Sequence, residues 1–161
     1  KYFTRSSDKD GLYGNNTDIL LFNAYHVKKY TKNFKLTEFK CKCKGKYCTG
    51  YPSKLDKDLL VYLQELRNKY GAITITSGLR CKTHNKNVGG VSNSRHLSAK
   101  ACDIKKAITF ATLYKRKQVM KEFIKKPEAR YTYCKGWYMN KTSEGYEKGS
   151  TMGTEIHIDV K

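Results

Sequence analysis

The stretch SRHLSAKACDIK, residues 94–105, places a histidine in a polar segment and an aspartate seven residues later, among apolar side chains. Its second half, KACDIK, is typical of a short strand, in which Asp103 has an apolar residue on either side. His96 stands just ahead of that strand. Because a strand that begins from a loop can bring residues of both parts to one point, we expect His96 and Asp103 to lie close together.

The C-terminal stretch TEIHIDV alternates between polar and apolar side chains. In a strand, such alternation directs the isoleucines to the core and directs Glu155, His157 and Asp159 to the opposite face. A catalytic zinc ion takes three protein ligands and keeps one position open for water. His96, Asp103 and His157, from two neighbouring strands, therefore form a candidate open zinc site. The alternative is an ordinary polar pair on the surface.

The remaining pattern predicts two amphipathic helices and two further strands. Leucines at helical spacing predict a first helix with its N-cap at Ser53, running to Tyr70 and ended by Gly71. We expect a second helix over residues 108–125 and strands at AITIT (72–76) and RYTYC (130–134). These elements predict an α+β fold, an antiparallel sheet packed against two or three helices.

The 161 residues fit a single domain. Residues 1–33 have an irregular pattern, in which the turn-rich segment SSDKDGLYGNNTD is followed by a short apolar stretch. We therefore divide the chain into an N-terminal arm, residues 1–33, with one anchoring element, and a domain over residues 34–161. The polar segment CKTHNKNVGGVSNSRH is predicted to be a long loop, which in a small domain is usually functional or disordered.

The net charge of +19 comes from 33 lysines and arginines against 14 acidic residues, and it attracts the protein to polyanions. Lysine outnumbers arginine by 27 to 6. Reading of bases favours arginine, so this excess indicates diffuse electrostatic adhesion rather than binding of a specific nucleic acid. On charge alone, anionic wall polymers and acidic lipid surfaces are equally good partners, and the alternative is an ordinary solvated basic surface. We expect no transmembrane segment, since no run approaches about 20 apolar residues, and we expect a monomer.

Six cysteines permit disulfides and indicate an oxidising compartment. Three of them cluster in the segment FKCKCKGKYC, and Cys81 is a candidate fourth member. We expect disulfides first. The alternatives are a structural zinc ion held by four thiols and a set of free thiols. The four thiols of the zinc alternative are those of Cys41, Cys43, Cys48 and Cys81.

The run SRHLSAKACD, residues 94–103, resembles the motif S-x-H-x-x-G-x-A-x-D of the D-alanyl-D-alanine metallopeptidases. That family includes wall carboxypeptidases, vancomycin-resistance dipeptidases and phage endolysins, and it shares its fold with the hedgehog signalling domain. Upstream, TSGLR, HN and VGG resemble the family's approach to the site. NFKLTEF resembles the start of a phage and bacterial subgroup, and IHIDV resembles its closing strand. The likeness covers residues from about 33 to 160, and it implies a zinc peptidase domain with a hedgehog/DD-peptidase-like zinc site.

The resemblance also implies roles for single residues. Its zinc ligands correspond to His96, Asp103 and His157. Arg80 resembles the arginine that contacts the substrate and helps to polarise its carbonyl group, with a surface salt bridge as the alternative. Ser94 and His84 are expected to line the substrate cleft. For His84, a structural hydrogen bond to the loop is the alternative.

Two positions depart from the family pattern. Ala99 replaces the family glycine, which requires either a negative φ at that position or room for the methyl group. Thr154 stands where relatives carry an acidic residue three positions before the last histidine. Glu155 is our first candidate for the general base. Asp159 is the second candidate, with orientation of His157 as its alternative role.

The implied function is zinc-dependent hydrolysis of peptide bonds in bacterial peptidoglycan, at or near a D-amino acid. The enzyme would be a D-Ala-D-Ala carboxypeptidase or an endopeptidase, using one catalytic Zn²⁺. We expect it outside the cell or at the cell wall, as a secreted bacterial or phage-encoded protein. One alternative is a zinc-containing wall- or protein-binding module without turnover. A further alternative, argued from charge alone, is a basic nucleic-acid-binding protein.

Overall fold

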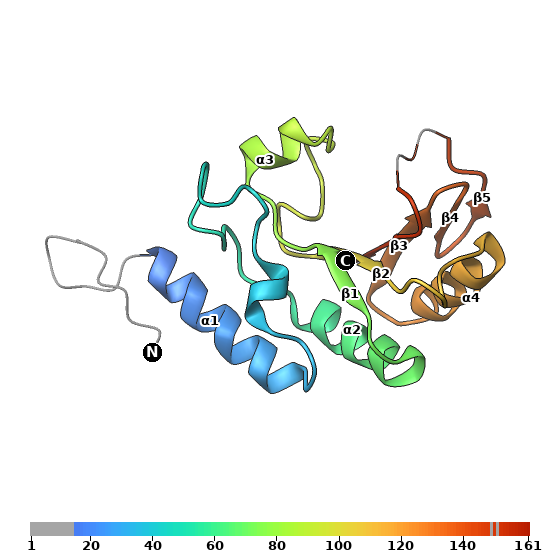
Figure 1. The fold of residues 1–161 in the computed structure, drawn as a ribbon, viewed down its shortest axis with the longest axis horizontal. Coiled ribbons are helices and arrows are strands. Elements are labelled where there is room, and N and C mark those ends of the chain that lie inside the picture. Colours follow the sequence, from blue (N-terminus) through green and yellow to red (C-terminus); the bar gives the residue numbers. More distant parts are fainter. Residues whose placement is uncertain (1–14, 149, 151) are drawn as a thin grey trace, which may run out of the picture.

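The computed structural model describes residues 15–148, 150 and 152–161 (Figure 1). Within these residues, two helices, a short 3₁₀ helix and one strand lie in the first half of the chain. In the second half a helix, a strand and a helix are followed by four consecutive strands. The elements are α1 (Asn15–Tyr30), η1 (Leu36–Phe39), α2 (Lys57–Tyr70), β1 (Thr74–Ser77), α3 (Lys82–Asn87), β2 (Ala101–Lys105), α4 (Leu113–Ile124), β3 (Ala129–Cys134), β4 (Trp137–Asn140), β5 (Glu144–Gly145) and β6 (Ile156–Val160).

The strands of the described residues form one antiparallel sheet in the order β1-β2-β6-β3-β4-β5. The last strand of the chain, β6, therefore lies between β2 and β3. In this register Asp103 of β2 and Tyr133 of β3 both lie opposite His157 of β6. The α+β fold with an antiparallel sheet packed against helices, predicted from the sequence, is confirmed.

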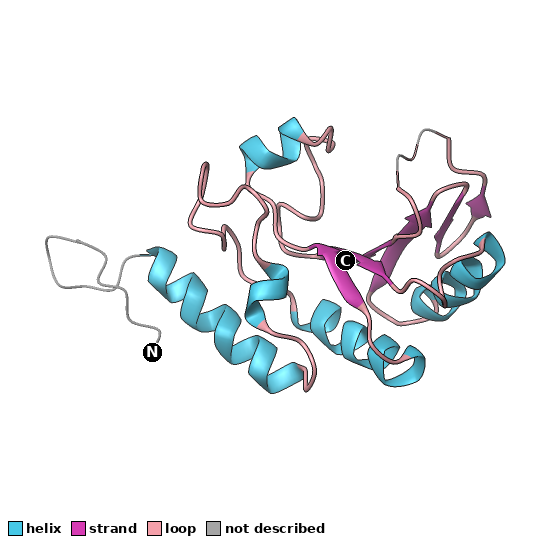
Figure 2. Cartoon of the chain, viewed as in Figure 1, coloured by secondary structure: helices cyan, strands magenta, loops and turns pink. Residues whose placement is uncertain are grey.

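The sheet buries one face under α2 and α4, which lie on the same side of the strands in Figure 2. Ile104, Ile156 and Ile158 are fully buried in the same apolar cluster as residues of both helices, such as Leu63 and Phe123. Since side chains alternate along a strand, the residues between these isoleucines face away from the helices. The polar residues of β2 and β6 are thus gathered on the other face of the sheet.

The predicted helices begin later than expected. Helix α2 starts at Lys57, because the carboxylate of Asp56 accepts hydrogen bonds from the backbone N–H groups of Asp58 (2.8 Å) and Leu59 (3.3 Å). The hydroxyl of Ser53, which we expected to cap this helix, instead donates to the carbonyl of Leu97 at 2.6 Å.

The ends of the predicted helices agree better with the sequence. Gly71, with a φ of 80°, ends α2 as predicted. Helix α4 ends at Ile124, close to the predicted end at residue 125, while its late start at Leu113 is set by the capping side chain of Thr112.

Residues 15–30 form the helix α1, where the sequence indicated an irregular arm with one anchoring element. Asn23 attaches this helix to the segment before α2. Its side chain donates to the carbonyl of Ser53 (3.0 Å) and accepts from the N–H of Leu55 (2.7 Å). Val27 adds an apolar contact with the core. Most of the turn-rich segment SSDKDGLYGNNTD lies outside the described residues, and the boundary at residue 33 stays a prediction.

All six cysteines, which lie within the described residues, are free thiols, so the expectation of disulfides is wrong for this structure. The reason is their arrangement. Cys102 and Cys134 lie on β2 and β3, which β6 separates. The other four cysteines converge on a single point instead of forming two separate pairs.

Gly78 directly follows β1, ahead of the segment 81–96, where the structure has the short helix α3 within the predicted long loop. Gly78 packs directly on the backbone of Phe39. A Cβ atom at this position would lie 2.7 Å from the carbonyl oxygen and 2.8 Å from the Cα atom of Phe39. The same carbonyl accepts a hydrogen bond from the N–H of Leu79 at 2.9 Å. The close approach of the two backbones therefore requires glycine.

We predict that Gly78→Ala lowers the free energy of unfolding by about 1–3 kcal/mol, the usual cost of overpacking a well-packed site. Denaturant titration of the metal-free chain measures this directly. Ser92→Ala, at an exposed position of the loop, serves as the control and should leave the unfolding midpoint unchanged. Equal midpoints for Gly78→Ala and the wild type would show that the two backbones are not held together.

Candidate metal centre

His96 is held in one orientation by the backbone between β1 and α3. Its Nδ1 lies 2.7 Å from the carbonyl oxygen of Gly78, which can only accept a hydrogen bond, so Nδ1 carries the proton. The N–H of Arg80 in turn donates to the carbonyl of His96 at 3.1 Å. The side chain is buried, with 2% exposed. Its Nε2 is left with a free electron pair, 3.3 Å from Oδ1 of Asp103.

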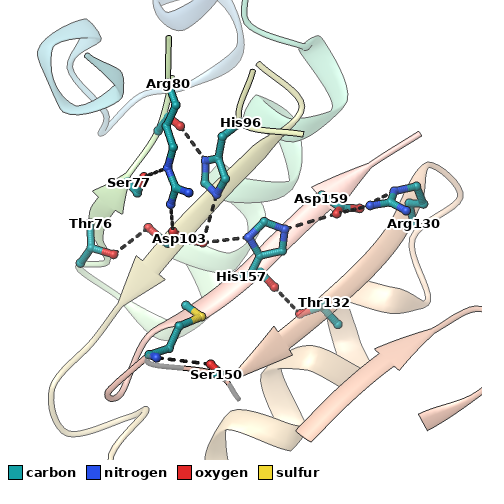
Figure 3. A network of polar contacts seen from close by, with 12 residues as sticks. Thr76, Ser77, Arg80, His96, Asp103, Arg130, Thr132, Ser150, His157 and Asp159 are labelled. Atoms are coloured by element: carbon teal, nitrogen blue, oxygen red, sulfur yellow. Dashed lines mark hydrogen bonds and ion pairs between the residues drawn. The ribbon is translucent and has the colours of Figure 1, made fainter. Parts of the chain in front are cut away.

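Asp103 and His157 meet across the pairing of β2 with β6 (Figure 3). Nδ1 of His157 lies 2.8 Å from Oδ1 of Asp103, the oxygen that His96 also approaches. One ligand atom from each of the three residues lies within 4.8 Å of the others. The three sequence-predicted residues are therefore brought together by the pairing of β2 with β6 and by the loop of His96, which hydrogen bonds to Gly78 and Arg80 hold in place.

Arg80 binds the other oxygen of Asp103. Its Nη2 donates to Oδ2 at 2.7 Å, and its Nε donates to the hydroxyl of Ser77 at 2.9 Å. The guanidinium is largely buried, with 15% of its side chain exposed. Arg80 therefore fixes the rotation of the carboxylate and leaves Oδ1 facing the two histidines. The alternative that we considered for it, an exposed surface salt bridge, does not describe this ion pair.

Asp159 lies on the outer side of His157. Its Oδ2 is 3.3 Å from Nε2 of the imidazole ring. Arg130 holds the same carboxylate in a bidentate pair, with Nε 2.9 Å from Oδ1 and Nη2 2.6 Å from Oδ2. A register shift in β3 between Ala129 and Tyr131 re-aims Arg130 toward this carboxylate. Figure 3 shows the resulting chain of contacts from Arg80 through Asp103, His157 and Asp159 to Arg130.

The burial of these groups shifts their pKa values in different directions. Burial by itself would raise the pKa of Asp103, but the contacts of its carboxylate with His157 and His96 outweigh it and hold that pKa well below its usual range. Burial lowers the pKa of His96. Burial would also lower the pKa of His157, yet its bonds to Asp103 and Asp159 raise it. The directions for Asp103 and His96 favour the ionised carboxylate and the neutral imidazole that metal ligation requires, whereas the raised pKa of His157 favours its protonated form while no ion is bound.

The donor set fits a zinc ion. Two imidazole nitrogens and one carboxylate oxygen are ligands that zinc prefers, with bonds of about 2.0–2.2 Å, and their separation of at most 4.8 Å is compatible with one ion. Each histidine also has its outer nitrogen engaged, His96 by a backbone carbonyl and His157 by a carboxylate. This is the outer shell that metal-binding histidines normally have. Three protein ligands leave one coordination position open.

Two cavities open on the centre. The first, of about 610 Å³, is lined by His96, His157 and the sequence-predicted Ser94, together with other loop residues. The second, of about 590 Å³, is lined by Asp103, the sequence-predicted Glu155 and their neighbours. Arg80 and Tyr133 line both cavities. The site is thus reached from two sides, which is an arrangement suited to an extended ligand.

His84, by contrast, is not among the residues that line either cavity. It lies in α3, where its backbone N–H donates to the sulfur of Cys81 at 3.4 Å. Its role in the cleft therefore stays a prediction.

The structure adds residues that sequence reasoning missed. These are Ser77, Arg130, Tyr133 and Glu147. Of these, only Tyr133 could have been found from the sequence, because the alternation in RYTYC places its side chain on the same face of the strand as that of Tyr131. Burial, followed by the nearby charge of Asp103, raises the pKa of Tyr133 to about 12, so its phenol stays protonated at neutral pH.

Ala99 adopts the left-handed conformation, with a φ of 59°. The first of the two conditions for replacing the family glycine, a negative φ, is therefore not met. The methyl group is buried, with 1% of the residue exposed, and it belongs to the main apolar cluster. Its packing offsets part of the backbone strain, which costs about 1–2 kcal/mol for a residue other than glycine.

A model of the peptidase M15 family matches residues 32–132, about five eighths of the chain. The chain belongs to the peptidase M15 family. M15 peptidases are zinc-dependent, in agreement with the donor set. The match includes Arg80, His96 and Asp103, and it ends before His157, which the structure places against Asp103. No curated protein matches the chain.

None of the helices in the described part of this M15 chain combines the length and the apolar character that crossing a membrane requires.

We predict that Asp159→Asn lowers the zinc affinity of this M15 chain by about 10- to 100-fold, because His157 loses the carboxylate that orients it. Competition with a chromophoric chelator measures the affinity. Asp18→Asn, at an exposed position of α1, is the matched control and should bind zinc like the wild type. If Asp159→Asn keeps full affinity but loses turnover, Asp159 acts on the substrate and does not orient its histidine.

Proposed function

We propose that this M15 chain is a zinc-dependent peptidase that hydrolyses peptide bonds of bacterial peptidoglycan at or near a D-amino acid. The observation that carries the proposal is the convergence of His96, Asp103 and His157 on one point beside two open cavities. When bound there, zinc would lower the pKa of a water molecule toward about 7 and polarise the scissile carbonyl group. The other steps fall to the side chains around it.

We assign the general base to Glu155. Its carboxylate lines the second cavity together with Asp103 and Arg80, and 23% of its side chain is exposed. The N–H of Gly153 donates to it at 2.8 Å, and Lys105 lies 4.0 Å away. These contacts fix its position while leaving oxygen lone pairs to accept a proton from water. The proton would then pass to the leaving amine.

Asp159 is less suited to the role of base. Its residue is 1% exposed, and both of its oxygens are engaged by Arg130. A carboxylate in a bidentate ion pair is a poor proton acceptor. We therefore assign Asp159 to the orientation of His157.

The negative charge that develops on the carbonyl oxygen needs hydrogen-bond donors. Arg80 and Tyr133 line both cavities, and we assign them to this task. The guanidinium is always charged, and the phenol of Tyr133 carries its proton at neutral pH. Donors that are already in place when charge develops stabilise a transition state strongly. Ser94, on the wall of the first cavity, would bind the substrate backbone, and we retain His84 as a more distant contact.

The substrate class agrees with the charge of the chain. With a net charge of +19, the enzyme would adhere to the anionic polymers of a bacterial envelope, with an attraction that salt weakens. We propose that it acts as a monomer outside the cell or at the wall, as a D,D-carboxypeptidase or an endopeptidase of the endolysin type. Thr154, in the place of the usual acid, is the one feature that favours the rival function of a zinc-containing binding module.

The proposed activity is tested on purified peptidoglycan and on muropeptides that end in D-Ala-D-Ala. Zinc-loaded chain should release products that chelation abolishes and added zinc restores, while His96→Ala should be inactive. Free D-alanine identifies a carboxypeptidase, and new amino termini without free D-alanine identify an endopeptidase. Zinc-loaded chain that sediments with peptidoglycan and releases nothing would establish the binding module instead.

The assignment of the base is tested with two isosteric changes in the same cavity. Glu155→Gln should lower kcat by about 100- to 10,000-fold, the usual contribution of a general base, without changing the zinc content. Glu147→Gln is the matched control. Its carboxylate also lines the cavity but accepts a hydrogen bond from the phenol of Tyr131 at 3.3 Å, so kcat should change by only a few-fold. The reverse pattern would make Glu147 the base.

A further inference from the structure

Four of the six cysteines meet at a second point, away from the peptidase centre. Three of them lie in the loop over residues 41–48, and Cys81 is the N-cap of α3. Their sulfur atoms all lie within 4.8 Å of one another, and Sγ of Cys43 is 3.5 Å from Sγ of Cys48. Four thiolates at about 2.3 Å from one ion in tetrahedral geometry would be about 3.8 Å apart. The cluster therefore has the dimensions of a metal site.

The cluster consists of thiols alone. Cys41, Cys43 and Cys81 are buried and Cys48 is partly buried, and together they form an apolar group separate from the main core. The loop that carries three of them has no helix or strand, and it contains the positive φ angles of Lys44 and Gly45. Four small side chains bury too little apolar surface to order such a loop. A metal ion that all four bind would supply the missing stabilisation.

Backbone N–H groups surround the sulfur atoms as they would surround thiolates. The N–H of Cys81 donates to Sγ of Cys41 at 3.4 Å, and that of His84 donates to Sγ of Cys81 at 3.4 Å. The N–H of Gly50 donates to Sγ of Cys48 at 3.3 Å. Hydrogen bonds to ligating sulfur atoms orient the ligands and offset their negative charge. Such donors give a neutral thiol little, since its sulfur is a weak acceptor.

The surrounding charge favours a thiolate-bound cation as well. Four thiolates around a divalent ion carry a net charge of −2. The loop alternates cysteines with lysines, and Lys42, Lys44 and Lys46 all lie within it. These cations offset the charge of such a centre. Without it, they would repel one another in a tight turn.

We propose that Cys41, Cys43, Cys48 and Cys81 bind a structural zinc ion. Four protein ligands close the coordination shell, so this ion has no open position for a substrate. The ion would connect the loop over residues 41–48 to Cys81, the residue that follows Arg80. Because the ligands of the two sites do not overlap, the loss of one ion can be told apart from the loss of the other.

The test is metal analysis of the full chain, purified under reducing conditions. The wild type should contain two zinc ions per chain, His96→Ala should retain one, and Cys43→Ser should also retain one. Cys134→Ser, at a buried cysteine outside the cluster, is the matched control and should keep two. One zinc in the wild type that His96→Ala loses would overturn the proposal, as would iron in place of zinc.

Two measurements on chains with intact cysteines keep the test decisive if Cys43→Ser fails to fold. Cobalt loaded into His96→Ala should give the thiolate-to-cobalt charge-transfer absorption of a tetrahedral four-sulfur site. A mercurial thiol reagent added to the wild type should release one zinc ion. Cobalt without that absorption, or an intact mass lowered by the hydrogens lost on disulfide formation, would contradict the proposal.

Discussion

The pairing of β6 between β2 and β3 is the constraint on which the site depends. It sets His157 opposite Asp103 on one side and opposite Tyr133 on the other. Because strand alternation has a period of two, the same pairing buries Ile156 and Ile158 against the helices. A slip by one residue would expose these isoleucines and bury the ligands in the core. The hydrophobic energy of the sheet thus fixes the register that brings the candidate metal ligands together.

The charges of the centre stabilise one another along a line that runs from the largely buried Arg80 to the exposed Arg130. Positive Arg80 and Arg130 lie at the two ends, and the carboxylates of Asp103 and Asp159 lie inside them, on either side of His157. Burying an isolated charge is costly, and pairing with hydrogen bonds offsets that cost. The alternation of charge explains why the ligands can be preorganised at low exposure. It also makes both arginines part of the centre, although neither has an atom that ligates a metal.

Much of this could be predicted from the sequence because it depends on local alternation. The pattern of TEIHIDV placed His157 on the face opposite Ile156 and Ile158, as the structure has it. Contacts between distant segments that no local pattern marks could not be predicted. Ser53, a good cap by its type, bonds to Leu97 instead and leaves the helix start to Asp56.

Two further features depended on the same kind of distant contact. Arg130 reaches Asp159 through a shift in strand register. The meeting of Cys81 with the 41–48 loop was one of the alternatives for the cysteines, and spacing alone could not choose it over disulfides. The four-residue segment 78–81 contributes to both sites. The carbonyl of Gly78 orients His96 and the side chain of Arg80 holds Asp103. Cys81, the last residue of the segment, belongs to the thiol cluster. Because four bonded residues span at most about 14 Å, a metal ion that clamps Cys81 would also restrict the positions of Arg80 and of the Gly78 carbonyl that orients His96.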